Sequence, residues 1–352
     1  MNFCYQLEID AAEQTQSASL CEIIEQYQPC AVTACDGAQL TIVSQTEQQG
    51  ASQSATDLAQ ERCRLVIQGL INVQDLSDIL ALLPVATVRT DWVASLYQPE
   101  SMGALVLGLA AVPDDLQRLT DLAADKAWEC NLLTQAPTVQ HPGLLLMDMD
   151  STAIEIECID EIAKLAGVGE QVAEVTELAM QGKLDFAESL RARVATLTDA
   201  DEVILARVRE QLPMSPGLPE LVTALRQKNW RVAIASGGFT YFADYLKETL
   251  PLDAAVSNVL EINDGKLTGK VLGGIVDAQR KADTLIELAE QFDIQPSQTV
   301  AAGDGANDLV MMDAAALGVA YHAKPVVAAK ATTALKFHGL EGIYYLLASA
   351  TS

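Results

Sequence analysis

Residues 144–161 have the sequence LLLMDMDSTAIEIECIDE, in which a continuous apolar run ends directly in two aspartates. A short apolar run that is followed by acidic and hydroxyl residues, and then by a helical pattern, is typical of a parallel strand buried on both faces. The runs RVAIAS (231–236) and TVAAGD (299–304) have the same form. The three runs predict an α/β domain with a Rossmann-like parallel sheet, whose ligands bind beyond the carboxyl ends of the strands.

The composition of the chain excludes several classes of protein. A net charge of −26 disfavours nucleic-acid and anionic-membrane partners. No apolar run approaches the roughly 18 residues that a membrane span needs, and MNFCYQLEID lacks the basic region of a secretory signal. Seven cysteines without a CxxC pair predict neither a disulfide framework nor a zinc ribbon. We therefore expect a cytoplasmic protein.

The turn-rich segment TVQHPG (138–143) predicts a joint between an N-terminal region, 1–140, and a catalytic domain, 141–352. Residues 62–137 have the element order βαββαβ, which is that of an α+β ferredoxin-like unit. Because 3–44 repeat the first part of this order, the region holds either one unit and a partial copy or two units, about 1–60 and 61–137. In element order it resembles ACT-like regulatory domains. A homodimerisation module without a ligand is an equal alternative.

Two acidic strand ends carry the chemistry that the sequence indicates. Asp148 and Asp150 are two residues apart, so their carboxylates can face one substrate, one attacking phosphorus while the other protonates the leaving oxygen. The sequence GDGAND (303–308) places further carboxylates among glycines, which suits a hard cation such as Mg²⁺. Each motif alone could also be structural, either a strand end followed by a helix cap or a glycine-rich turn.

Two further features suit a phosphate group. Ser236-Gly237-Gly238 follows an apolar strand and offers a hydroxyl and an exposed backbone N–H. Lys281, in AQRKADTL, lies at the start of a predicted helix. A serine cap and a solvated lysine are the ordinary interpretations of the two features when each is taken alone.

Taken in order, the motifs DMDST (148–152), Ser236, Lys281 and GDGAND (303–308) resemble those of the haloacid dehalogenase-like phosphohydrolases. The resemblance implies that Asp148 is a nucleophile that forms an aspartyl phosphate and that Asp150 is the acid/base. It also implies a Mg²⁺ cofactor. The remaining roles that the resemblance implies are metal binding by Asp148, the Asp150 main-chain carbonyl and Asp304, support of the metal's water shell by Asp308, phosphoryl binding by Ser236, Gly237 and Lys281, and a lining position for Asn307.

Residues 153–235 hold several helical stretches, which predict a helical cap over about 155–215 that closes the site. The segments STAIEIECIDEIAKLAG, MQGKLDFAESLRARV, ASGGF and NDGKLTG are similar to the phosphoserine phosphatase family. That similarity implies hydrolysis of O-phosphoserine to serine and phosphate, the last step of serine biosynthesis. It further implies that Glu157 binds the substrate ammonium and Arg193 its carboxylate, with Met180 and Phe186 covering the pocket.

Two alternatives remain at this point. The chain could act on another small phosphomonoester, or transfer the phosphoryl group to an alcohol such as homoserine. It could also be a degenerate phosphatase kept as a regulatory protein, although the intact set of motif residues argues against this. Without the resemblance, Glu157 and Arg193 would be ordinary helix residues.

Overall fold

The computed structural model describes residues 7–10, 30–35, 39–44, 62–83, 87–96 and 103–349. They form two compact units, the first comprising Met1–Gln140 with Leu335–Ser352 and the second His141–Ala334. The sequence predicts one domain over 141–352, but the structure instead groups the C-terminal segment with the first unit. None of the helices in the described part of the chain is long and apolar enough to cross a membrane.

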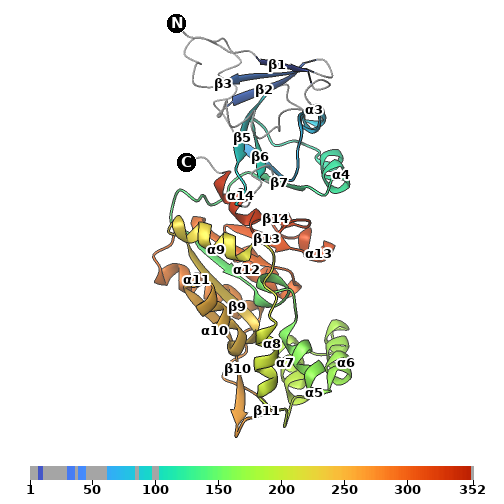
Figure 1. Cartoon of the computed structure of the whole chain (residues 1–352), viewed down its shortest axis with the longest axis vertical. Coiled ribbons are helices and arrows are strands. Elements are labelled where there is room, and N and C mark those ends of the chain that lie inside the picture. Colours follow the sequence, from blue (N-terminus) through green and yellow to red (C-terminus); the bar gives the residue numbers. More distant parts are fainter. Residues whose placement is uncertain are drawn as a thin grey trace. The chain divides into compact units, whose positions relative to one another are not determined.

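The second unit is built around a seven-stranded sheet with the order β11-β10-β9-β8-β12-β13-β14 (Figure 1). Strands β10, β9, β8, β12 and β13 are parallel to one another, and β11 is antiparallel to β10. Every residue of β8, β12 and β13 is buried, which explains their unbroken apolar sequences. The strands are β8 (Leu144–Met147), β9 (Arg231–Phe239), β10 (Ala254–Asn263), β11 (Lys266–Leu272), β12 (Thr299–Gly303), β13 (Leu317–Tyr321) and β14 (Thr333–Leu335).

Helices flank this sheet and complete its core. Apolar residues of α11 and α12 pack on β8, β9 and β12 in one buried cluster. Asp277 begins α11 by accepting a hydrogen bond from the Arg280 backbone N–H, at 2.9 Å. The helices of this layer are α9 (Leu218–Gln227), α10 (Thr240–Thr249), α11 (Ala278–Gln291), α12 (Leu309–Ala314) and α13 (Pro325–Ala328).

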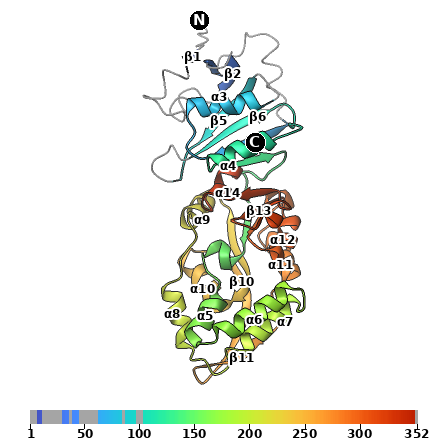
Figure 2. The same ribbon diagram turned by 90° about the vertical axis from the view of Figure 1, so that its right-hand side faces the viewer.

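A second group of helices is inserted between β8 and β9: α5 (Cys158–Ala166), α6 (Gly169–Met180), α7 (Phe186–Ala195) and α8 (Val203–Glu210). Figures 1 and 2 both show α5, α6 and α7 gathered at one end of this unit, beside β11. Backbone hydrogen bonds of 2.9 Å join the segment between α7 and α8 to the β10–β11 hairpin, for example from the Asp199 N–H to the Leu267 carbonyl. We refer to α5, α6 and α7 as the cap.

The first unit contains a second seven-stranded sheet, with the order β1-β3-β2-β5-β6-β4-β7 and antiparallel pairs throughout. Over 63–133 its elements follow the predicted βαββαβ order, whereas the ACT-like interpretation stays a prediction. Residues 11–29 and 45–61 of the possible first unit lie outside the described residues. The elements are β1 (Leu7–Asp10), β2 (Cys30–Cys35), β3 (Gln39–Ser44), β4 (Cys63–Gln68), α3 (Val73–Leu82), β5 (Thr87–Val93), β6 (Ala104–Leu109), α4 (Gln117–Asp125) and β7 (Glu129–Leu133).

The C-terminal segment belongs to the first unit because helix α14 (Gly342–Ala348) packs against β4. Its residues Ile343 and Leu347 are fully buried. Glu129 in β7, only 3% exposed, accepts hydrogen bonds from the backbone N–H groups of residues 336–338 at 2.8, 2.6 and 2.9 Å. Burial of the helix and satisfaction of a buried carboxylate thus fix the segment in this unit.

Candidate active site

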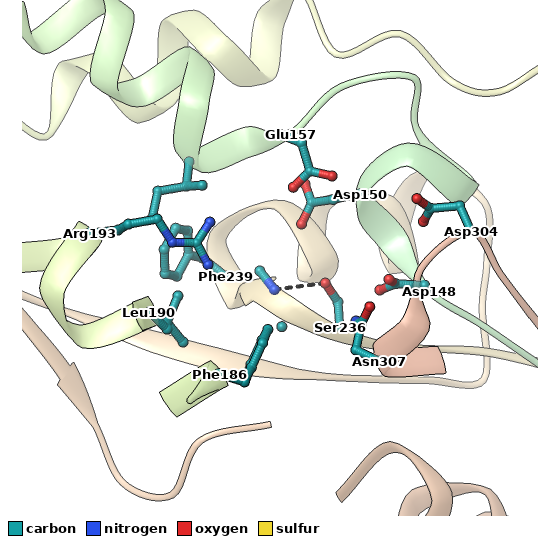
Figure 3. Close-up of a pocket in the computed structure, with 13 residues that line it drawn as sticks. Asp148, Asp150, Glu157, Phe186, Leu190, Arg193, Ser236, Phe239, Asp304 and Asn307 are labelled. Carbon is teal, nitrogen blue, oxygen red and sulfur yellow. Dashed lines mark hydrogen bonds between the residues drawn. The ribbon is translucent and has the colours of Figure 1, made fainter. Parts of the chain in front are cut away.

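A cavity of about 150 Å³ lies beyond the carboxyl ends of β8, β9 and β12, facing the cap (Figure 3). This volume is below the roughly 300 Å³ of pockets for drug-sized ligands, so the cavity suits a small metabolite. Its lining residues are Asp148, Asp150, Glu157, Ile159, Phe186, Leu190, Arg193, Ser236, Gly237, Gly238, Phe239, Asp304 and Asn307.

Asp148 follows β8 directly and is held by contacts to β12 and α11. Its backbone N–H donates to the Ala302 carbonyl at 2.9 Å, and the Lys281 ammonium lies 2.8 Å from its Oδ1. Lys281, 1% exposed, also contacts Asp308 Oδ1 at 2.7 Å. Burial alone would lower the pKa of Lys281, but the charges of Asp148 and Asp308 outweigh it and raise the pKa. Lys281 is therefore a fixed positive charge beside Asp148.

Three carboxylates converge at this point. Asp148, Asp304 and Asp308 each offer an oxygen, and these oxygens all lie within 4.8 Å of one another. Burial raises the pKa of Asp304 to about 6, and the charges of Asp148 and Glu157 add to the effect. Thr152 Oγ1 donates a hydrogen bond to Asp304 Oδ1 at 3.2 Å, which fixes that side chain. Crowded oxygen ligands of this kind suit a hard divalent cation such as Mg²⁺.

Asp150, two residues after Asp148, also lines the cavity. Its Oδ1 accepts a hydrogen bond from the backbone N–H of Cys158, at 2.9 Å. Burial raises the pKa of Asp150 to about 7, the charge of Glu157 adds to this, and the Cys158 N–H opposes it. A carboxyl group with a pKa in this range can both give up and accept a proton near neutral pH.

The carboxyl end of β9, Ser236 to Gly238, lines the cavity. Ser236 is completely buried, and its Oγ accepts a hydrogen bond from the Gly238 N–H at 2.8 Å. Phe186 of the cap covers Gly237 so closely that a Cβ added at residue 237 would lie 2.6 Å from Phe186 Cζ. Glycine at 237 therefore allows the aromatic ring to close over the site.

Glu157 and Arg193 approach the cavity from the cap. Glu157 precedes α5, and its Oε1 accepts a hydrogen bond from Ser151 Oγ at 2.9 Å. Arg193, from α7, enters from the side opposite Asp148 and Asp304 (Figure 3).

The guanidinium group of Arg193 has unused binding capacity. Its Nε is buried and has no hydrogen-bond partner among the described residues. Burial lowers the pKa of Arg193, while the charges of Glu157 and Asp160 act in the opposite direction. A buried donor without a partner is costly, so this group is suited to receive a ligand oxygen.

Most of the residues singled out from the sequence line this one cavity. Lys281 and Asp308 lie behind it in contact with Asp148 or with each other, and the side chain of Met180 is outside the described part of the structure. Sequence reasoning missed Ile159, Leu190 and Phe239, and it gave Gly238 no role of its own. Leu190 could have been found, because Phe186, Leu190 and Arg193 are spaced to share one helix face. The other two apolar residues look like ordinary core positions.

The sequence and fold were compared with known proteins. Residues 143–316 match the haloacid dehalogenase-like hydrolase family. The phosphoserine phosphatase of Vibrio cholerae is 66% identical over 218 residues, which cover 62% of this chain and 66% of that protein. The phosphoserine phosphatase of Haemophilus influenzae is 58% identical over 61% of this chain and 68% of that protein. The chain belongs to the phosphoserine phosphatase family.

Solved structures of this family have the same fold. A crystal structure described as a probable phosphoserine phosphatase from Vibrio cholerae superposes with a TM-score of 0.72 at 49% identity, covering 84% of this chain and 91% of that one. A phospho-aspartyl intermediate analogue of a phosphoserine phosphatase superposes with a TM-score of 0.55 at 39% identity, over 58% of this chain and 99% of that one. The parallel sheet with its inserted helices is thus the haloacid dehalogenase-like fold.

Proposed function

We propose that this chain hydrolyses O-phosphoserine to serine and phosphate through an aspartyl phosphate on Asp148. The observation that carries the proposal is that one small cavity joins two kinds of chemistry. Asp148, Lys281 and Asp304 suit phosphoryl transfer on one side. Arg193, whose Nε has no hydrogen-bond partner among the described residues, lies on the other side with Glu157. A phosphate ester that carries both a carboxylate and an ammonium group matches this pairing.

The oxygen cluster fits Mg²⁺, which requires hard oxygen ligands. We assign Asp148, Asp304 and the main-chain carbonyl of Asp150 as its ligands, with Asp308 supporting its water molecules. When bound there, the ion would offset the repulsion between an attacking carboxylate and a phosphoryl group.

The reaction begins with attack of an Asp148 oxygen on phosphorus. As that O–P bond forms, the bond between phosphorus and the serine oxygen breaks, and this oxygen takes the proton of Asp150. Serine then leaves with a free hydroxyl group, and Asp150 is ionised. In the second step Asp150 takes a proton from water while the water oxygen attacks phosphorus. The bond to Asp148 breaks, phosphate is released, and both carboxyl groups return to their starting states.

Charge on the phosphoryl oxygens is balanced by groups that the chain already holds in place. Lys281 is fixed by two carboxylates. The buried Ser236 hydroxyl is oriented by the hydrogen bond that it accepts from the Gly238 N–H. We assign these two residues, the Gly237 N–H and the Asn307 amide to the phosphoryl group, where preorganised donors stabilise the transition state most.

Recognition of the serine part is assigned to the cap. The Arg193 guanidinium can form two parallel hydrogen bonds with the substrate carboxylate, and Glu157 can pair with the ammonium. Phe186 already lies over Gly237, so it would exclude water from the reacting groups. We keep Met180 as a second covering residue on the strength of the family resemblance alone.

We further propose that the first unit is an ACT-like module for regulation or homodimerisation, and that the reaction is the last step of serine synthesis in the cytoplasm. Support for a separate role comes from the positions of the motifs. Every assigned catalytic and binding residue lies within His141–Ala334, the second unit.

The function is tested by measuring phosphate release with Mg²⁺ from a panel of phosphomonoesters. O-phosphoserine should give the highest kcat/KM, above O-phosphohomoserine, glycerol phosphate and p-nitrophenyl phosphate. A higher kcat/KM for any other member of the panel would overturn the substrate assignment. Failure to release phosphate from every member would overturn the phosphatase assignment itself.

A further inference from the structure

The carboxyl group of Asp150 is enclosed on two sides by different parts of the second unit. On one side its Oδ1 accepts the backbone N–H of Cys158 at 2.9 Å. On the other side, a Cβ added at residue 238 would lie 2.5 Å from Asp150 Oδ2. Real Cβ atoms essentially never come this close to another atom, so the space that a side chain at 238 would need is taken by the Asp150 carboxyl group, together with Met149 Cε at 2.6 Å.

The Cys158 N–H is free for this contact because of its place in helix α5. Cys158 is the first residue of the helix and is completely buried. The first N–H groups of a helix have no partner within the helix, and Glu157, which precedes it, makes no side-chain capping bond. Asp150 therefore takes the place of a capping residue for the first helix of the cap.

Gly238 makes the matching contribution from the sheet. It follows Ser236 at the end of β9, and its own N–H donates to Ser236 Oγ. Its lack of a side chain leaves room for Asp150 Oδ2, so glycine is required here by close approach.

We propose that Cys158 and Gly238 are positioning residues that together hold Asp150 where it can protonate the leaving oxygen. The cap supplies one contact and the sheet the other, so the proton donor is correctly placed only when both elements are in place. This inference rests on the acid/base role assigned to Asp150 under the proposed function.

The chemistry of the first step gives a specific readout. When the bond between phosphorus and the ester oxygen breaks, an alkyl oxygen must take the Asp150 proton, because a free alkoxide is a poor leaving group. The oxygen of p-nitrophenyl phosphate leaves as a stabilised phenolate and needs the proton far less. Misplacing Asp150 should therefore slow alkyl esters much more than this aryl ester. A general loss of structure would slow both alike.

The N–H of Cys158 can be removed without removing the helix. Proline is favoured at the first position of a helix, and Glu157 has φ −93° and ψ 106°, close to the backbone that a residue before proline adopts. Cys158→Pro removes the N–H and the thiol, whereas Cys158→Ala removes the thiol alone. The ratio of kcat/KM between the two variants therefore isolates the contribution of the N–H.

The comparison is made in kcat/KM, which covers the steps up to departure of the leaving group. Relative to Cys158→Ala, we expect Cys158→Pro to lose about tenfold or more on O-phosphoserine and on glycerol phosphate, but less than about threefold on p-nitrophenyl phosphate. Glycerol phosphate lacks the serine groups, so its loss cannot come from weaker recognition of them. Ala278→Pro is the matched control, because it places proline at the first position of α11 after an extended residue.

Gly238→Ala tests the second contact and carries the test if Cys158→Pro does not fold. The added methyl group should push the Asp150 carboxyl group aside. The loss in kcat/KM should therefore again be larger on both alkyl esters than on p-nitrophenyl phosphate. Equal losses on alkyl and aryl esters in a folded variant would overturn the inference. Wild-type protein that hydrolyses glycerol phosphate but not O-phosphoserine would instead overturn the proposed substrate and leave the alkyl–aryl comparison intact.

Discussion

Replacement of Arg193 by alanine is the most informative perturbation of substrate choice. Arg193 lines the cavity, takes no part in the bond-making steps, and has a buried Nε without a partner among the described residues. The guanidinium has therefore already lost much of its hydration before a ligand binds. A substrate carboxylate would supply the missing partner, and the alanine variant would leave that carboxylate unpaired.

The size of the effect follows from this geometry. Removing one member of a desolvated, hydrogen-bonded charge pair costs about 2–4 kcal/mol. Since about 1.4 kcal/mol corresponds to a factor of ten, Arg193→Ala should lower kcat/KM for O-phosphoserine about 30- to 1000-fold. On p-nitrophenyl phosphate, which has no carboxylate, only packing is lost, and we expect a decrease of about fivefold or less.

The assay compares kcat/KM on these two substrates in wild type, Arg193→Ala, Arg193→Lys and a control. Arg191→Ala is the control, because Arg191 lies in the same helix but is exposed and outside the cavity. Lysine at 193 should rescue only part of the loss, since a point charge cannot reproduce the two parallel hydrogen bonds of a guanidinium. Equal losses on both substrates would refute the recognition role and mean that Arg193 supports the cap.

Three further perturbations test the rest of the account. Asp148→Asn should lower kcat by about a thousandfold or more, because a neutral amide cannot attack phosphorus; near-normal turnover by the folded variant would exclude Asp148 as the nucleophile. Chelation of metal should abolish phosphate release, and Mg²⁺ should restore it while Ca²⁺, with its longer bonds, should not; activity that survives chelation would remove the metal from the mechanism. A fragment 141–334 should be folded and soluble, whereas a fragment 141–352 should self-associate, because Ile343 and Leu347 lose the sheet that covers them. Light scattering measures the size of both fragments in solution, and equal behaviour of the two would contradict the placement of α14.

Much of the catalytic half was predictable because its strands are buried on both faces. A continuous apolar run that ends in a polar motif marks both the strand and the edge where ligands bind. The structure accordingly brings Asp148, Ser236 and Asp304 to one cavity. The roles of these residues were inferred from the order of the motifs along the chain, because no single motif was specific enough to assign them.

The β10–β11 hairpin was missed, although a local signal existed. Asp264 and Gly265 both have positive φ, 48° and 77°, and Asp-Gly is a preferred pair for a two-residue hairpin turn. The signal was weak because few residues of the flanking strands are buried and the strands lack a clear alternation of apolar and polar residues.

The partner of the C-terminal helix could not be predicted at all. An apolar pattern shows that α14 is buried, but it does not show what covers it. Strand β4 and Glu129 lie far earlier in the sequence. The three hydrogen bonds to Glu129 come from backbone N–H groups, which every residue type except proline carries, so the sequence does not reveal them. The contacts that enclose Asp150 were equally hidden, because one is a backbone N–H and the other is a missing side chain.

We propose above all that hydrolysis of O-phosphoserine passes through a phosphate bound to Asp148. The most direct test is rapid acid quenching of the enzyme during turnover of O-phosphoserine labelled in its phosphate, followed by mapping of protein-bound label. We expect label on the peptide that contains Asp148, released by hydroxylamine as expected for an acyl phosphate, and none in Asp148→Asn. Turnover without protein-bound label, or with the label on another residue, would contradict it.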